Sequence, residues 1–323
     1  MEIRPFHFSD ADYASYSEIR CAARPEYPIT EDEYKEDDQR RESHRKFARF
    51  LAVEDGKIVG VAQYDQNPWV YHPDRYDLEL FVLPEWQGRG YGNALYERLC
   101  AELASFDPQQ LILHPHENEE RFLQFAEERG FVETLRHLAS WLFLADFPYG
   151  AFLTERLKVA EQGIVIKPLR EREGDPDYQS KVWELESITS TDVPSSEPLT
   201  PQPFEIYSKF VFERSNYLPD GFFVALDEAT GEYVGSSSVW KRQADNDLDQ
   251  GLTAVRREYR RRGIALALKL QVTEWAKSQG FRAIRAENEV SNIGMLTVNR
   301  KLGFVPQPAQ LEFTKRVRSE EES

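Results

Sequence analysis

Two short glycine-bearing segments are the places where this chain is best equipped to bind an anion. Residues 87–92 read QGRGYG and residues 260–265 read RRRGIA. Each follows an apolar, strand-like run and opens a stretch with the apolar spacing of a helix. Free N–H groups at a helix N-terminus attract phosphate oxygens, and glycine lets the backbone approach the anion closely. Arginines in both segments, such as Arg89 and Arg260, add charge-assisted contacts.

Two common nucleotide-binding loops do not fit these segments. The chain contains no GxxxxGK[ST] pattern, so neither segment is a Walker loop. In the first segment Asn93 stands where a dinucleotide-binding GxGxxG loop has its third glycine. The segments therefore indicate a phosphate site of another class.

The surroundings of the two segments repeat along the chain. Residues 80–95 and 253–268 align without a gap, and in both halves a Gly-Phe pair follows the loop glycine at 40 residues. The matching features are Gly90 and Gly263, Gly130-Phe131 and Gly303-Phe304, and the turns at 56–60 and 231–235. Matches at nearly one offset indicate a duplicated domain.

The elements that must position the two loops follow the same order in each half. Expected strands are 3–6, 48–53, 58–64, 77–82, 111–113 and 132–143, then 164–166, 221–226, 232–240, 252–255, 283–286 and 305–313. Expected helices are 90–103, 118–128, 178–187, 203–212, 263–278 and 293–301, and residues up to Lys46 are helical in character. We expect an α/β (α+β) fold in which each half is a mixed sheet flanked by helices. The domains are predicted as 1–147 and 163–323, with 148–162 as a linker.

Composition narrows the class of protein. The 323 residues hold 40 Lys and Arg against 56 Asp and Glu, and the net charge of −16 argues against nucleic acid or an anionic membrane as partner. Cys21 and Cys100 are the only cysteines, so neither a disulfide framework nor a cysteine metal site is expected. No signal peptide and no apolar run of about 20 residues is present. We expect a soluble, cytoplasmic protein without a metal.

The loops and their context resemble the GNAT superfamily of N-acetyltransferases. The cofactor loop of that family reads Q/R-x-x-G-x-G/A, which residues 87–92 and 260–265 both match at every fixed position. The family's second motif has an Asn eleven residues before a Gly-Phe pair, as Asn292 stands here. The resemblance covers nearly the whole chain as two tandem copies, an organisation similar to that of the mycothiol-synthase-like group.

The resemblance implies an acetyl-CoA-dependent acyltransferase. In that family the loop holds the pyrophosphate of acetyl-CoA, and a bulge in the preceding strand, near Val82 or Val255 here, presents an N–H group to the thioester carbonyl. The cofactor-binding residues expected from it are Val82, Gln87, Gly88, Arg89, Gly90, Tyr91, Gly92, Val255, Arg260, Arg261, Arg262, Gly263, Ile264, Ala265, Asn288, Asn292 and Asn299.

The chain departs from the family at the position of the general acid. Many members have a Tyr four residues before the glycine of the Gly-Phe pair, where this chain has Ala126 and Asn299. Either another acid serves or the thiolate leaves without one. In the first half Glu119 also replaces the motif Asn. An Asn inside a helix, as at position 299, indicates a hydrogen-bonding role.

A general base is needed because an amine at neutral pH is mostly ammonium. Glu79, three residues before Val82, and Glu287 are the catalytic candidates. His114, His116 and Glu289 are alternatives, and each of these side chains also fits a plain surface role. Because the second half keeps both motifs, we expect it to be the catalytic one, while the first half either binds CoA without turnover or shapes the substrate cleft.

The sequence thus predicts transfer of acetyl from acetyl-CoA to a primary amine of a small molecule or peptide, by a monomer or homodimer. A non-catalytic CoA-binding or scaffold protein built from the same duplication is the alternative, and the absence of the Tyr from both halves favours it. The acceptor itself is not visible in the sequence.

Overall fold

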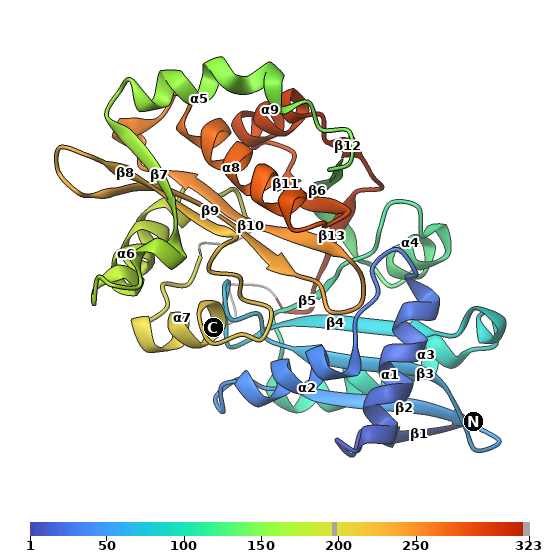
Figure 1. Ribbon diagram of the computed structural model, residues 1–323. Helices are drawn as coiled ribbons and strands as arrows, with labels where there is room; N and C mark the ends of the chain where they lie inside the picture. The colour runs from blue at the N-terminus through green and yellow to red at the C-terminus, as the bar shows by residue number, and fades with distance from the viewer. Residues whose placement is uncertain (196–198, 319–323) are drawn as a thin grey trace. The chain divides into compact units, whose positions relative to one another are not determined.

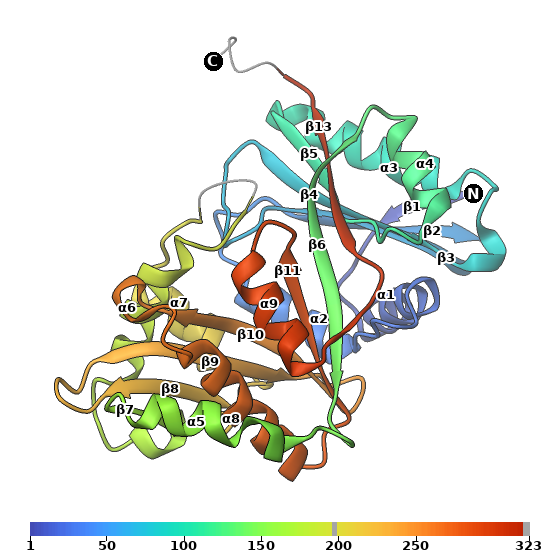
Figure 2. The same cartoon turned by 90° about the horizontal axis from the view of Figure 1, so that it is seen from above.

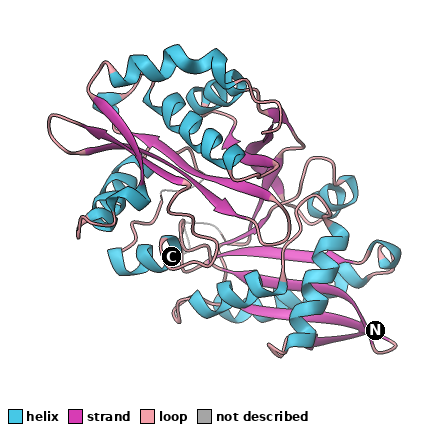
Figure 3. Ribbon diagram, viewed as in Figure 1, coloured by secondary structure: helices cyan, strands magenta, loops and turns pink. Residues whose placement is uncertain are grey.

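The computed structural model describes residues 1–195 and 199–318 and forms two compact units (Figure 1). The first unit comprises Met1–Arg136 together with residues 310–318. The second unit comprises His137–Ala309. Helices lie against strands in both (Figure 3).

A mixed sheet of six strands forms the first unit among its described residues. The strands run in the order β1 (Glu2–Pro5), β2 (Ala48–Glu54), β3 (Lys57–Asp65), β4 (Arg75–Val82), β5 (Gln110–Leu113) and β13 (Gln310–Arg316). All neighbours are antiparallel except β4 and β5, which are parallel. The helices are α1 (Asp10–Ala23), α2 (Glu31–Arg40), α3 (Tyr91–Leu103) and α4 (Glu120–Glu127).

The described part of the second unit has the same plan. Its strands run in the order β7 (Ile164–Pro168), β8 (Phe222–Asp227), β9 (Tyr233–Lys241), β10 (Asp247–Val255), β11 (Ala283–Glu289) and the C-terminal part of β6 (Val132–Phe143), on which β12 (Val305–Pro306) also pairs. Only β10 and β11 are parallel here. The helices are α5 (Leu153–Ala160), α6 (Tyr178–Ser190), α7 (Phe204–Val211), α8 (Ile264–Ser278) and α9 (Ile293–Leu302). The predicted mixed α/β fold and its duplication are confirmed.

One helix packs unusually close to the sheet in each unit, and a glycine makes this possible. A Cβ on Gly60 would lie 3.0 Å from Cδ1 of Leu95 in α3. A Cβ on Gly235 would lie 3.1 Å from Cδ1 of Leu268 in α8. On the opposite face of the first sheet, Phe81 packs with the aromatic residues of α1 and α2. The repeated glycines of the sequence are therefore sites of close helix–sheet contact.

The compact units differ from the expected segments 1–147 and 163–323, because the sixth strand of each sheet comes from the other half of the chain. The boundary falls inside β6, and β13 belongs to the first unit, beside β5 (Figure 2). The strand expected over 305–313 is divided into β12 and β13, with Pro306 and Pro308 at the break. Proline lacks the N–H group that a continuous ladder needs.

The expected linker 148–162 is part of the second unit's core. It contains α5, and Phe152 and Val159 are buried among the apolar residues that α8 and the sheet contribute. An amphipathic helix that buries such side chains is stabilised by packing, so this segment is held in place rather than free.

A buried lysine on α8 makes the stability of the second unit depend on pH. Lys269 is 1% exposed, and its Nζ lies 5.0 Å from the ring centre of Phe304. Burial lowers the pKa of Lys269 to about 7. Between this value and the ordinary lysine pKa the unfolded chain binds one more proton than the folded chain, so stability rises with pH across that window.

We expect Lys269→Met to stabilise the second unit by a few kcal/mol at pH 7, since each unit of pKa shift corresponds to about 1.4 kcal/mol. The gain should shrink steadily toward pH 10, which is close to the ordinary lysine pKa of 10.5, because most of the pH window has then been crossed. Thermal melts at pH 7, 8.5 and 10 measure this gain in stability. The matched control is Lys241→Met, since Lys241 is exposed. A gain of the same size at all three pH values would contradict this account.

Candidate functional site

The first glycine loop presents the beginning of a helix to open space. It follows the short 3-10 turn Pro84–Trp86, and α3 begins directly after Gly90. Gly88 and Gly90 have φ values of +75° and +93°, which favour glycine over other residues. No side chain caps α3, and nothing lies within 4 Å of the position that a Cβ on Gly90 would take. The first N–H groups of α3 are therefore available to an anion.

A groove of about 690 Å³ runs beside this loop in the first unit. That volume suits a cofactor-sized ligand. Its walls are the end of β4, the loop, and α4 with the residues before it. The lining residues include Leu80, Phe81, Val82, Trp86, Gln87, Gly88, Gly90, Gly92, Asn93, Arg121, Phe122 and Phe125. Five of the residues expected to bind the cofactor thus line one cavity.

The groove lies where two parallel strands separate. β4 and β5 pair from Arg75 opposite Gln110 to Leu78 opposite Leu113, and the groove begins two residues later, at Leu80. In the second unit β10 and β11 pair over only three positions, Asp247 to Asp249. Strands that part in this way expose backbone groups that a ligand can pair with.

A bulge was expected near Val82 or Val255, and the two units differ in this respect. The pairing of β3 with β4 runs without a register shift through Gly60 opposite Val82. In β10 the shift lies between Gln250 and Thr253, before Val255. The separation of the parallel strands, rather than a bulge at the valine, opens the first site.

The sequence motifs did not predict the wall of the groove that α4 forms opposite the loop. Nη2 of Arg121 lies 2.8 Å from the position that a Cβ on Gly88 would take. Cε2 of Phe125 lies 3.9 Å from the position that a Cβ on Gly92 would take. Arg121 forms no ion pair with any residue of the described ranges, whereas Arg89 stacks over Trp86 at 4.8 Å. The signal for this wall was the placement of Arg121 and Phe125 four residues apart, on one face of α4.

The second loop has the same backbone shape as the first. Arg261 and Gly263 have φ values of +62° and +86°, matching Gly88 and Gly90. Gln87 donates its Nε2 to the carbonyl of Val82 at 3.1 Å, and Arg260 donates its Nε to the carbonyl of Val255 at 2.9 Å. An arginine in the left-handed region costs about 1–2 kcal/mol. The second loop therefore keeps this shape against a local penalty.

The side chains around the second loop are joined to one another. Arg257 donates its Nε to the Asp192 carboxylate at 3.0 and 3.1 Å, and Arg260 forms a second ion pair with the same group. These two arginines hold the pKa of Asp192 well below its usual range. Arg262 and Gln162 exchange two hydrogen bonds, at 2.9 and 3.1 Å. Cγ2 of Val159 lies 3.5 Å from the Cβ position of Gly263.

The three asparagines expected to contact the cofactor, Asn288, Asn292 and Asn299, form hydrogen bonds within the second unit. Asn299, which is 3% exposed, donates its Nδ2 to Oδ1 of Asn288 at 2.7 Å and so ties α9 to β11. Asn292 caps α9 by accepting from the N–H of Met295 at 3.2 Å. The hydrogen-bonding role expected for Asn299 is confirmed, and contact of these residues with a cofactor stays a prediction.

The two catalytic candidates differ in how they are held. Glu79 accepts hydrogen bonds from Nε2 of Gln63 at 2.7 Å and from the hydroxyl of Tyr16 at 3.2 Å. Burial holds the pKa of Tyr16 well above its ordinary value, so this hydroxyl remains a donor. Glu287 lies exposed on β11, opposite Ala139 of β6. Glu289 accepts from the N–H of Ser291 at 2.7 Å and shapes the turn that follows β11.

The two histidines after β5 have opposite environments. Nε2 of His114 lies 2.9 Å from Oδ1 of Asp77. Burial alone would lower the pKa of His114, but the hydrogen bond and charge of Asp77 outweigh it and raise that pKa. Burial and the nearby charge of Arg24 lower the pKa of His116 to about 4. His116 is therefore neutral near pH 7, whereas the pKa of His114 lies above the ordinary histidine value.

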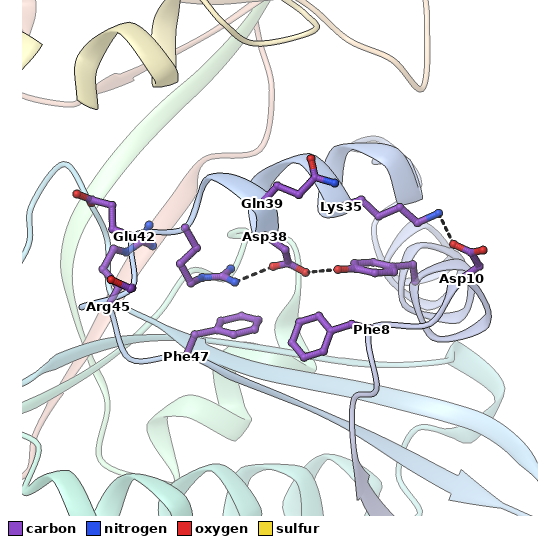
Figure 4. Close-up of a pocket in the computed structure, with 11 residues that line it drawn as sticks. Phe8, Asp10, Lys35, Asp38, Gln39, Glu42, Arg45 and Phe47 are labelled. Atoms are coloured by element: carbon purple, nitrogen blue, oxygen red, sulfur yellow. Dashed lines mark hydrogen bonds and ion pairs between the residues drawn. The ribbon is translucent and has the colours of Figure 1, made fainter. Parts of the chain in front are cut away.

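A second cavity of about 620 Å³ in the first unit is bordered by α1, α2 and the start of β2 (Figure 4). Its charged side chains bind one another. Lys35 pairs with Asp10 at 2.8 Å, and Asp38 accepts from the hydroxyl of Tyr13 at 2.7 Å and from Arg41 at 2.8 Å. These pairs stabilise the contact of α2 with α1 and with the sheet.

Within residues 1–195 and 199–318, no group of three or more His, Cys, Asp or Glu side chains is arranged to hold a metal ion. In the same part of the chain, no helix combines the length and apolar character required to cross a bilayer.

Sequence comparison identifies the family of both units. A model of the acetyltransferase (GNAT) family matches residues 13–131 and again residues 183–304. No curated protein sequence matches the chain. The two matched ranges contain the two loops and the two Gly-Phe pairs.

Solved structures share the fold over the full length. A tandem GNAT protein from the clavulanic acid biosynthesis pathway, solved without AcCoA, has 18% identity and a TM-score of 0.76 over 99% of each chain. A GCN5-related N-acetyltransferase from Sphaerobacter thermophilus has 17% identity and a TM-score of 0.72, over 98% of this chain and 96% of that one. A GNAT-family acetyltransferase from Colwellia psychrerythraea has 12% identity and a TM-score of 0.62, over 98% and 100%.

Both halves match the family in sequence, and their sheets and loops repeat one plan. The chain belongs to the acetyltransferase (GNAT) family, as a tandem of two GNAT domains.

Proposed function

We propose that this protein transfers an acetyl group from acetyl-CoA to a primary amine of a small molecule or peptide, using the groove of the first unit. The observation that carries the proposal is that groove. It joins an uncapped helix N-terminus, a cationic side chain and the end of β4 that continues beyond its pairing with β5, in one cavity of cofactor size. Family membership supports acyl transfer as the reaction.

The first loop fits a pyrophosphate. The residues that would hold it are Gly88, Gly90, Tyr91 and Gly92 through their N–H groups, with Arg121 supplying charge from the opposite wall. Val82, at the end of β4, lines the inner part of the groove, where the thioester arm would lie. Bound acetyl-CoA supplies an activated thioester carbonyl.

Glu79 is the candidate to receive the amine. It belongs to the β4 segment that continues beyond the last residue paired with β5, and two hydrogen bonds fix its carboxylate. A fixed negative charge attracts and orients an ammonium group, which promotes attack by placing the nitrogen correctly. Glu287 would have the corresponding role if the second unit also bound acetyl-CoA.

The proposal differs from the sequence-based expectation that the second unit is catalytic. The second unit retains the Asn motif, but its asparagines are used in capping and in joining α9 to β11. Arg260 of its loop and Arg257, just before the loop, pair with Asp192. The first loop borders a groove, so we assign the cofactor to it.

A non-catalytic CoA-binding protein is the second candidate, favoured by one observation. The general-acid position holds Ala126, which is fully buried, and Asn299, and neither can donate a proton to a leaving thiolate. Measuring CoA release with spermidine, kanamycin and peptides as acceptors separates the two. Tight acetyl-CoA binding without release by any acceptor would favour the second candidate.

The loop glycines give a matched pair of variants, because their backbone angles are nearly equal. We expect Gly90→Val to weaken acetyl-CoA binding by about tenfold or more, since the side chain would block the approach of phosphate and strain the backbone. Gly263→Val imposes a similar strain on α8 and should change binding less than about twofold. Calorimetry measures both, with circular dichroism to confirm folding. Loss of binding only in Gly263→Val would move the cofactor to the second unit.

Asp192 offers a test of the second loop. The ion pairs of Asp192 bridge the end of α6 and the second loop, whereas in the first unit Ala23, at the end of α1, and Gln87, which aligns with Arg260, border the open groove. We expect one acetyl-CoA per chain in the wild type and additional, weaker binding in Asp192→Asn, because two arginines lose their internal anion.

Asp175→Asn is the control for this experiment, since it removes a carboxylate that is 19% exposed, as Asp192 is, and that pairs with Lys181 and Arg172. Calorimetric stoichiometry is the measurement. Two equivalents bound by the wild type would show that Asp192 does not close the second site.

A further inference from the structure

We infer that His114, oriented by Asp77, is the catalytic base that takes the proton from the acceptor ammonium in the first unit; this rests on the function proposed above. The inference names a base that lies outside the glycine loops and the Asn motif. It depends on the register of the strands, the tautomer of the imidazole and the charges around it.

The register brings His114 close to Glu79, the residue just before Leu80, where the lining of the groove begins. Leu78 of β4 is the last residue paired with β5, opposite Leu113. Glu79 and His114 follow this last pair. Both are close to Asp77, since His114 is hydrogen-bonded to it and Glu79 is two residues from it on the same face of β4. Glu79 can hold the ammonium group while a neighbouring imidazole receives its proton.

The contact with Asp77 determines which nitrogen of His114 accepts a proton. Nε2 lies 2.9 Å from a carboxylate oxygen, which can only accept a hydrogen bond when ionised, so the hydrogen of the neutral ring is on Nε2. Nδ1 then carries the lone pair. The side chain of His114 is 34% exposed, so the ring remains within reach of a substrate and of water.

Charged groups from three elements surround the imidazole. Asp77 and Glu79 approach from β4. Glu312 approaches from β13, because Phe313 pairs with Leu113 in an antiparallel ladder and Glu312 therefore lies opposite His114. Arg24 of α1 donates to the backbone carbonyl of His114 at 2.8 Å. The three carboxylates outweigh burial and raise the pKa of His114, and they also favour a cationic acceptor.

The proposed step is a single proton transfer. A proton leaves the ammonium nitrogen for Nδ1 of His114, which yields a neutral amine and an imidazolium ion. Asp77 stabilises the imidazolium through Nε2–H, and the proton then passes to water from the exposed side of the ring. An imidazole whose pKa lies above its ordinary value of 6.5 is a stronger base for this transfer than an ordinary carboxylate, with its pKa of about 4.

The first measurement does not need the cofactor. NMR titration of the full chain without ligand should give His114 a pKa above 6.5, the ordinary value for histidine. Asp77→Asn removes the charge that opposes burial, so the pKa of His114 should fall. An unchanged titration in Asp77→Asn would overturn the role assigned to Asp77.

The second measurement is the pH dependence of kcat/KM, with whichever of spermidine, kanamycin or a peptide amine reacts fastest. In the wild type kcat/KM should rise with pH through the pKa that NMR assigns to His114. His114→Gln should lose that rise and fall about 10²-fold or more, and added imidazole should restore part of the rate. His7→Gln, an exposed histidine before α1, is the control.

The outcomes separate this inference from the proposed function. If His114→Gln keeps the wild-type rate and pH profile, the inference is wrong while acetyl transfer stands. If the wild type acetylates no acceptor and binds no acetyl-CoA, the proposed function fails. Should His114→Gln not fold, the pH profile of Asp77→Asn decides, because it must shift in parallel with the His114 pKa.

Discussion

The close contact between one helix and the sheet controls the position of each glycine loop. Leu95 of α3 packs over Gly60, and Leu268 of α8 packs over Gly235, at distances that leave no room for a Cβ. These contacts fix the helix axis against the strands, so the helix N-terminus lies at the end of β4 or β10. The left-handed glycines then let the chain turn from strand to helix in a few residues. Without this contact, the N–H groups of the loop would have no defined place relative to the separating strands.

Duplication preserved that backbone arrangement and changed what surrounds it. Arg261 keeps the left-handed angle of Gly88 although arginine disfavours it, which shows that neighbouring contacts determine the shape of the loop. In the second unit those neighbours include Val159 and Gln162 from the α5 region and Asp192 after α6. The first loop has Arg121 and Phe125 of α4 across a groove instead. A conserved loop shape is therefore compatible with an open site in one unit and an internally bonded one in the other.

Local pattern was enough to predict most of the fold and both loops. The hairpin of β2 and β3, the helices after the loops and the cap at Asn292 all depend on neighbours a few residues apart. The sequence could not show that β6 pairs with β11 of the second unit and β13 with β5 of the first. Both strands have the same alternation of side chains, and only long-range pairing determines their partners. For the same reason, the sequence named His114 without Asp77, and missed Arg121 and Asp192. Their roles arise from contacts between segments far apart in the chain.

Strand exchange also ties the candidate site of the first unit to the last strand of the chain. Side chains on one face of its sheet form a continuous polar row, from Gln63 and Glu79 through His114 to Glu312, whose carboxylate accepts from Thr134 at 2.9 Å. Glu312 enters this row only when β13 pairs with β5. Such a pairing joins residues about 200 positions apart, and contacts of that range form late because closing a long loop costs entropy. The first unit therefore holds a cofactor loop that can form early, and a set of acceptor-side charges that is complete only after the second unit has been made.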